Sequence, residues 1–177
     1  MIIDRRLHWS YDTKAMQMND LDSIDKRILE LLQRDGRASS SAIALEVGLS
    51  QPSVHERMKK LSQRGVIKGY TALLEPEALG LSVLAFISVR YTTKTDAVAQ
   101  AVARMPEVLE AHHIAGDDCL LLKVRCRAPR DLERVIERIW DSGPVASTNT
   151  TIVLSSYKEI CALPLDACAD ERREAGA

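Results

Sequence analysis

Three short helix patterns separated by helix-breaking residues occupy residues 22–64, and they constrain the fold more than any other feature of the chain. The second pattern ends at Gly48, and the third begins directly after Ser50. A short glycine-containing turn between two small helices is typical of a helix-turn-helix. Each pattern starts with a good N-cap, because Asp22, Ser39 and Ser50 can accept hydrogen bonds from free backbone N–H groups. The sequence therefore predicts a compact three-helix DNA-binding fold.

The segment that follows the third helix is predicted to be a strand. Residues 66–74 are mostly apolar or β-branched, and Glu75-Pro76 ends the pattern. Such a strand is the expected wing of a winged helix-turn-helix. We therefore assign residues 21–66 to the DNA-binding domain and residues 67–80 to the wing and the linker.

The second half of the chain has a different rhythm. Strand patterns cover 83–91, 108–115, 120–127 and 147–156, and helix patterns cover 95–105 and 130–140. The order βαββαβ is that of a ferredoxin-like sandwich. The predicted fold class is therefore α+β, with a winged helix-turn-helix followed by a second domain over residues 81–165. Residues 157–165 are a candidate edge strand.

Both ends of the chain lack periodic patterns. Residues 1–20 are expected to form a flexible extension, with a basic arm bearing Arg5, Arg6 and Lys14 as the alternative; Met16 or Met18 could also be the true start. Residues 166–177 are expected to be disordered.

Charge is distributed unevenly although the net charge is only −1. Residues 21–70 contain nine Lys and Arg against six Asp and Glu, whereas residues 71–177 contain twelve against sixteen. A basic segment beside an acidic one is typical of a nucleic-acid reader joined to a domain that does not touch DNA. The sequence shows no secretory signal and no apolar run long enough for a membrane span, so we expect a cytoplasmic protein without membrane contact.

The third helix carries the candidate DNA contacts. Polar residues of its first turns can meet base edges, and basic residues further along can meet phosphates. Arg57 flanks the apolar stripe, so an internal ion pair is the alternative for this residue. A solvated polar face without a partner is the alternative for the whole set. The candidates are Ser50, Gln51, Ser53, His55, Arg57, Lys59, Lys60 and Arg64.

Two sets of motifs resemble those of one protein family. The first set is Leu21-Asp22-x-x-Asp25-x-x-Ile28-Leu29, Gly36-Arg37, Gly48-Leu49-Ser50, Val54-x-x-Arg57-x-x-x-Leu61 and Gly65-Val66-Ile67. The second set is Gly116-Asp117, Leu121-Leu122-Lys123 and Thr148-x-Thr150. Together they resemble the leucine-responsive regulator/asparagine regulator (Lrp/AsnC) family over residues 21–165.

The resemblance implies a transcription regulator that binds double-stranded DNA. It also implies a homodimer that assembles into an octamer or another higher oligomer. An amino acid or related small metabolite would bind between sensing domains and shift assembly and DNA affinity. No other cofactor is expected. Carried over by motif, the effector-site candidates are Gly116, Asp117, Asp118, Cys119, Thr148 and Thr150.

The candidate effector turn departs from the family pattern. The family usually has Gly-Asp, a large residue and a second Asp, whereas this chain has Asp118 and Cys119 at the last two positions. A hydrogen-bond acceptor is therefore lost where one is expected. Asp118 could replace it through a one-residue slip, at the cost of moving the strand register. An architectural DNA-wrapping protein that ignores metabolites is the alternative function.

A few other residues could serve as a nucleophile, as metal ligands or as further DNA contacts, but the rest of the sequence does not support these roles. Cys119 could be a nucleophile, but neighbouring carboxylates raise a thiol's pKa. His112 or His113 could join Cys119 at a metal, although adjacent strand residues point to opposite faces. The arginines at 130, 134 and 138 could touch wrapped DNA, or form a solvated face with nearby glutamates. No CxxC pair, phosphate loop or catalytic triad is present, so we predict neither an enzyme nor a metal site.

Overall fold

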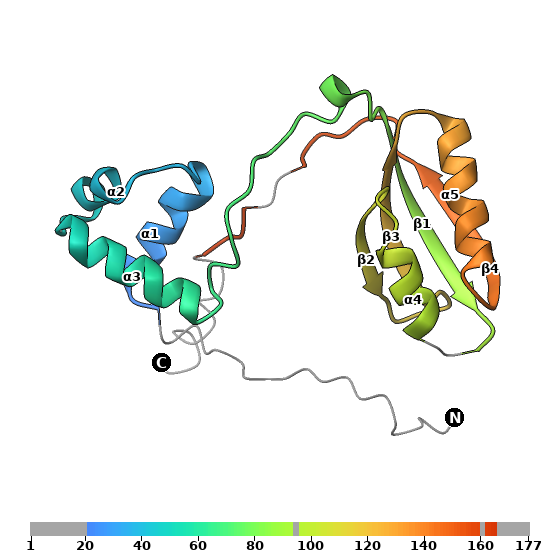
Figure 1. Ribbon diagram of the computed structural model, residues 1–177, viewed down its shortest axis with the longest axis horizontal. Helices are drawn as coiled ribbons and strands as arrows, with labels where there is room; N and C mark the ends of the chain where they lie inside the picture. Colours follow the sequence, from blue (N-terminus) through green and yellow to red (C-terminus); the bar gives the residue numbers. More distant parts are fainter. Residues whose placement is uncertain (1–20, 94–95, 160–161, 166–177) are drawn as a thin grey trace, which may run out of the picture. The chain divides into compact units, whose positions relative to one another are not determined.

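The computed structural model describes residues 21–93, 96–159 and 162–165, which form two compact units (Figure 1). Of the described residues, one unit comprises 21–72 together with 162–165, and the other comprises 73–93 and 96–159. The predicted extension at 1–20 and the predicted tail at 166–177 lie outside the described residues.

The first unit contains the helices α1 (Ser23–Arg34), α2 (Ser40–Val47) and α3 (Gln51–Gln63). All three predicted N-caps are confirmed. The Asp22 carboxylate accepts from the Asp25 N–H at 2.7 Å, and the Ser39 and Ser50 hydroxyls accept from backbone N–H groups at 3.2 and 3.3 Å. Gly48 ends α2 in the left-handed conformation that glycine adopts without penalty.

Apolar residues at helical spacing close the core of this unit. Ile28 of α1, Ile43 of α2, and Val54 and Leu61 of α3 are almost completely buried. Each helix is too short to be stable alone in water, so this shared core holds the three helices together. The core therefore fixes how α3 is presented.

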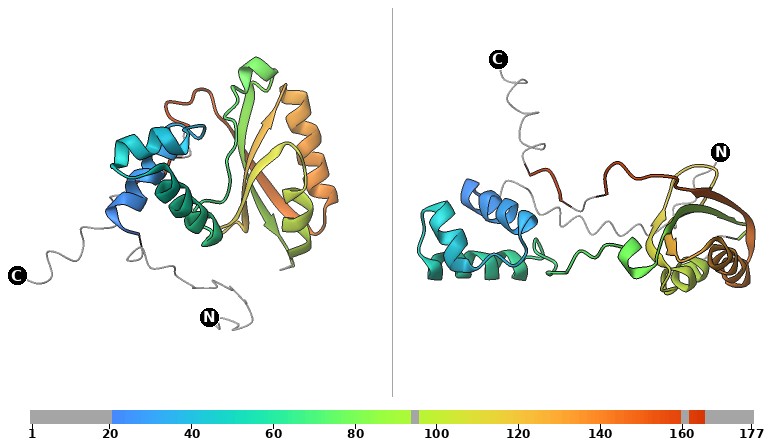
Figure 2. Two further views of the ribbon diagram at one scale, coloured as in Figure 1. Left: turned by 60° about the vertical axis from the view of Figure 1, so that its left-hand side comes forward. Right: turned by 90° about the horizontal axis from the view of Figure 1, so that it is seen from above.

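The second unit is a four-stranded antiparallel sheet with two helices on one face (Figure 2). Its sheet order is β2-β3-β1-β4, as expected for a ferredoxin-like sandwich. The elements are β1 (Val83–Tyr91), α4 (Asp96–Ala103), β2 (Val108–His113), β3 (Leu120–Cys126), α5 (Pro129–Asp141) and β4 (Val145–Ile152).

Side chains alternate between the two faces of this sheet. On β3, Leu120, Leu122, Val124 and Cys126 are buried with α4 and α5, and Lys123 and Arg125 lie on the face without helices. On β1, Ile87 and Val89 pair with the buried β3 residues. The sequence thus separates an apolar face from a helix-free face that is partly polar.

Two strand predictions are wrong. Residues 66–74 form no strand, because they pair with no other part of the described chain; Glu77–Leu79 instead form a short 3₁₀ helix before Gly80. The candidate edge strand at 157–165 is absent over its described residues. β4 also begins at Val145 and ends at Ile152, where its pairing with Ala85 ends, rather than spanning 147–156.

Candidate DNA-binding face and effector turn

The start of α3 exposes polar side chains. Gln51, Ser53 and His55 are all solvent-exposed, and Ser50 caps the helix. The Ser50 and Ser53 hydroxyls also lie 2.8 Å apart. Ser50 and Ser53 therefore help to build the helix start, whereas Gln51 and His55 extend from it toward solvent.

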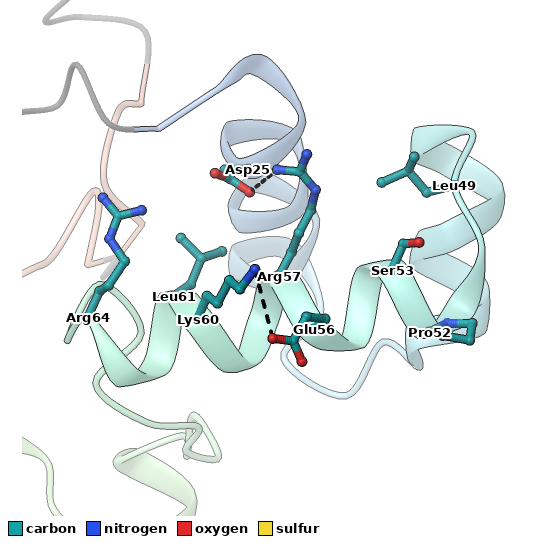
Figure 3. Close-up of a pocket in the computed structure, with 9 residues that line it drawn as sticks. All are labelled: Asp25, Leu49, Pro52, Ser53, Glu56, Arg57, Lys60, Leu61 and Arg64. Carbon is teal, nitrogen blue, oxygen red and sulfur yellow. Dashed lines mark hydrogen bonds and ion pairs between the residues drawn. The ribbon is translucent and has the colours of Figure 1, made fainter.

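The later turns of α3 supply positive charge. Lys59, Lys60 and Arg64 are exposed. The Lys60 ammonium lies 3.9 Å from the Glu56 carboxylate one turn earlier, and both side chains are more than half exposed (Figure 3). Such an exposed pair is weak and breaks readily in favour of a stronger anion. These charges fit contacts with a phosphate backbone.

Arg57 is held inside the unit. Its Nη1 atom donates to the Asp22 Oδ2 atom at 2.7 Å and to the Asp25 Oδ1 atom at 2.8 Å. The Asp25 side chain is only 11% exposed. These hydrogen bonds raise the pKa of Arg57. The pKa of Asp22 is lowered, mainly by the hydrogen bond from the Asp25 N–H and also by the hydrogen bond from Arg57. Of the two roles open to Arg57, the structure shows the internal pair, which joins α3 to α1.

A shallow depression of about 640 Å³ lies beside α3 (Figure 3). It contains basic and acidic groups and is open to solvent, so it differs from the enclosed apolar cavities that bind small molecules. It is a surface depression on the candidate DNA-binding face. Its lining residues are Asp25, Leu49, Pro52, Ser53, Glu56, Arg57, Lys60, Leu61 and Arg64.

The candidate effector turn joins β2 to β3. Gly116 has φ +147°, a backbone conformation that other residues rarely adopt, so it allows the turn. Asp117 is exposed. The Cys119 N–H donates to the Val89 carbonyl at 2.9 Å, and the Cys119 carbonyl accepts from the Ile114 N–H at 3.1 Å. Backbone hydrogen bonds at Cys119 therefore hold the end of the turn, whereas Asp117 at its tip is exposed to solvent.

Asp118 has a partner that the sequence did not suggest. Its carboxylate lies 3.6 Å from the Arg90 guanidinium at the end of β1. Leu120 stays opposite Val89 at the start of β3. A single arginine in the otherwise largely apolar β1 pattern was the only sequence signal for this contact.

Two threonines complete the candidate set, and they lie at different levels of the sheet. Thr148 pairs with Val89, whose carbonyl also receives the Cys119 N–H from the other side of β1. Thr150 pairs with Ile87, further from the turn. The structure therefore brings Thr148 to the level of the turn and leaves Thr150 farther away.

Neighbouring residues extend the turn region. The Tyr91 hydroxyl lies 3.4 Å from the His113 Nδ1 atom, and His113 Nε2 lies 4.0 Å from Asp96. Burial, followed by electrostatic interaction with Cys119 and Asp96, raises the pKa of Tyr91. His112 instead lies near Glu110 at 3.4 Å. The described residues contain no group of three or more His, Cys, Asp or Glu arranged to hold a metal ion.

Two of the three arginines in the α5 stripe have acidic partners. Arg134 contacts Asp131 at 3.0 Å, and Arg138 contacts Glu107 at 2.9 Å. The glutamates next to them in sequence are not these partners. Among the helices that the structure describes, none has the length and apolar character needed to cross a membrane.

Both units of the chain resemble domains of known proteins. Residues 21–62 match the AsnC-type helix-turn-helix domain, and residues 83–163 match the Lrp/AsnC ligand binding domain. The HTH-type transcriptional regulator FL11 of Pyrococcus horikoshii is 40% identical over 146 residues, covering 82% of this chain and 97% of that protein. The leucine-responsive regulatory protein of Escherichia coli K12 is 35% identical over 153 residues, covering 84% and 93%.

A solved structure has a similar fold. The transcriptional regulator NMB0573 of Neisseria meningitidis, in complex with L-methionine, has a TM-score of 0.78 and 31% identity, covering 82% of this chain and 97% of that chain. The fold and both domain matches define a non-enzymatic, DNA-binding transcription regulator with a ligand-binding domain. The chain belongs to the Lrp/AsnC family.

Proposed function

We propose that α3 reads a specific DNA sequence, and that its first turns contact bases whereas its later turns contact phosphates. Gln51, Ser53 and His55 would meet base edges, since a glutamine can pair with adenine and a serine tolerates several bases. Lys59, Lys60 and Arg64 would meet phosphates. The observation that carries this division is the exposure of both sets on one capped helix, whereas Arg57 is held by Asp22 and Asp25. Arg57 then acts as a positioning residue.

The Gly116–Cys119 turn is our candidate for the effector site. An amino acid or a related small metabolite offers an ammonium and a carboxylate. The exposed Asp117 carboxylate would hold the ammonium, and the Gly116 N–H would face the carboxylate. The L-methionine in the NMB0573 structure supports an amino-acid-like ligand in this fold.

The altered end of this turn bears on ligand choice. Asp118 is engaged by Arg90, and Cys119 lies where the family usually has a second acceptor. Cys119 is half-buried and packs against the apolar core. Thr148, at the same level of the sheet, would supply a hydroxyl. A ligand with fewer hydrogen-bonding groups beyond its ammonium and carboxylate would suit this site.

Assembly is the second part of the proposal. The helix-free sheet face carries the partly exposed Phe86 and Leu121. Elsewhere on the sheet, Leu109 and Ile152 are each about half exposed. Apolar surface of this kind favours association with a second copy. We propose a homodimer that assembles into an octamer or another higher oligomer, acting in the cytoplasm.

Replacing Asp117 by alanine is expected to weaken the effector response. Loss of a charged contact to an ammonium lowers ligand affinity by roughly ten- to a hundredfold. Sedimentation velocity with a pool of the common amino acids would measure the shift in assembly size. Asp141→Ala is the matched control, because Asp141 is an exposed aspartate at the end of α5 and is not part of the turn. An Asp117→Ala protein that still shifts like the wild type would move the effector site elsewhere. A wild-type protein that never shifts would favour the effector-blind architectural alternative.

A further inference from the structure

Arg90, near the end of β1, brings a positive charge to an acidic turn. The turn contributes the carboxylates of Asp117 and Asp118, which suit a ligand's ammonium but repel a ligand's carboxylate. The Arg90 Nη2 atom lies 3.6 Å from the Asp118 Oδ1 atom. Of the ion pairs between described residues, this is the only one that involves the turn. Arg90 therefore supplies the charge that the carboxylate of an amino acid needs.

The contact between Arg90 and Asp118 is loose. The two atoms lie farther apart than the ~2.9 Å of a typical hydrogen bond, and the two side chains are 49% and 29% exposed. A guanidinium has five N–H donors, and this one has no other hydrogen-bond or ion-pair partner among the described residues. Exposed pairs of this kind add little stability. A ligand carboxylate that binds the guanidinium through two oxygens can therefore replace Asp118.

The backbone of Arg90 is held firmly although the head of its side chain is exposed. Val89, directly before Arg90, lies between Leu120 of β3 and Thr148 of β4. The Val89 carbonyl also accepts from the Cys119 N–H of the turn at 2.9 Å. The same strand thus holds both the backbone of Arg90 and the end of the turn. Only the Arg90 and Asp118 side chains have to move when Arg90 changes its partner.

We propose that Arg90 is a specificity-determining residue of the effector site, and that it exchanges Asp118 for the carboxylate of the effector. Without ligand, Asp118 contacts the guanidinium as an internal substitute for that carboxylate. With ligand, Arg90 and the Gly116 N–H bind the carboxylate, and Asp117 binds the ammonium. The ligand class is then amino acids with a free carboxylate, and their carboxamides are rejected. This inference rests on the proposed effector site and adds to it a residue outside the turn.

Equilibrium dialysis of the full chain against a pool of the common amino acids identifies the ligand and measures its affinity. The retained amino acid is then compared with its own carboxamide, which keeps the ammonium but loses the negative charge. Mildly acidic pH keeps both ammonium groups charged. We expect the wild type to bind the carboxamide roughly ten- to a hundredfold more weakly, because a charged contact is lost. Equal binding of the two compounds would overturn the proposal.

Arg90→Ala separates a ligand contact from a structural role. Loss of the contact should reduce the preference for the acid over the amide roughly tenfold, whereas a structural change would weaken both compounds alike and leave the preference unchanged. Arg90→Lys should keep part of the preference, because it retains the charge but not the paired donors. Arg104→Ala, at another exposed arginine of this unit, should change nothing. A full preference in Arg90→Ala would overturn the proposal.

Asp118→Asn tests the exchange of partners. The ligand no longer competes with an internal carboxylate, so it should bind about two- to fivefold more tightly, as expected for loss of an exposed ion pair. Asp141→Asn is the matched control at an exposed aspartate of α5. Unchanged or weaker binding in Asp118→Asn would contradict the exchange, and weaker binding would make Asp118 a ligand contact.

Acetate tests Arg90 without relying on the effector. Phenylglyoxal reacts with arginine side chains, and mass spectrometry measures the labelling of each arginine in the full chain. Acetate should slow labelling of Arg90 about twofold or more, because a bound carboxylate occupies the guanidinium donors, and it should not protect Arg104. Less acetate should suffice in Asp118→Asn. Labelling of Arg90 that does not respond to acetate in either protein would overturn the proposal. If the wild type retains no amino acid while acetate protects Arg90, the proposed effector function fails and the carboxylate contact stands.

Discussion

Replacing Arg57 by methionine lowers the stability of the DNA-binding unit by about 2 to 3 kcal/mol. The substitution leaves the largely buried Asp25 carboxylate without its cation, and breaking a buried pair from one side is costly. Breaking a fully buried pair costs about 3 to 5 kcal/mol, and we expect less here because the Arg57 side chain is 31% exposed. Hydrogen exchange at the α1 amides measures the local loss, and Arg37→Met is the control at an exposed arginine.

The same variant separates the two roles of Arg57. Adding Asp25→Asn to Arg57→Met should recover part of the lost stability, because the uncompensated charge is then removed. DNA affinity should fall in Arg57→Met as α3 loses its tie to α1, and it should recover in parallel with stability in the double variant. An Arg57→Met protein with wild-type stability and much weaker DNA binding would make Arg57 a direct DNA contact.

The Lys59→Ala and Lys60→Ala double variant binds DNA roughly a hundredfold more weakly at low salt. Each lost phosphate contact removes counterion release, so the slope of log affinity against log salt flattens by about 0.9 per contact. The weakening should be similar on all DNA sequences, because phosphates carry no sequence information. Fluorescence anisotropy over a salt series measures both quantities.

A matched change of charge controls for long-range electrostatics. Arg104→Ala with Arg127→Ala removes the same charge from exposed positions of the sensing unit. This control should leave the salt slope unchanged. If the Lys59 and Lys60 variant keeps both its affinity and its slope, the phosphate contacts must lie on other residues.

Local signals in the sequence predicted the helices well. Helix caps and stops depend on residues within one helical turn, so a short stretch of sequence is enough to predict them. This holds for the caps at Asp22, Ser39 and Ser50 and for the stop at Gly48. Strand β1 was also predicted with its observed ends, because its apolar run is bounded by a clear change in pattern.

Contacts between distant residues could not be predicted in the same way. Residues 66–74 have strand-like composition, but a strand forms only with a partner, and the partner cannot be read from the segment itself. The same limit applies to the candidate sites. Asp118 contacts Arg90 of β1. The role of Arg57 stayed open in the sequence, because its position beside the apolar stripe of the third helix allows either an exposed DNA contact or an internal ion pair.

The central claim is that this chain reads specific DNA and changes its binding when it holds an amino-acid-like metabolite. Fluorescence anisotropy on the DNA upstream of its own gene, against scrambled DNA, with and without an amino-acid pool, tests it most directly. We expect tighter binding to the upstream DNA and a shift in affinity on adding the pool. Equal binding to both DNAs with no shift would contradict it.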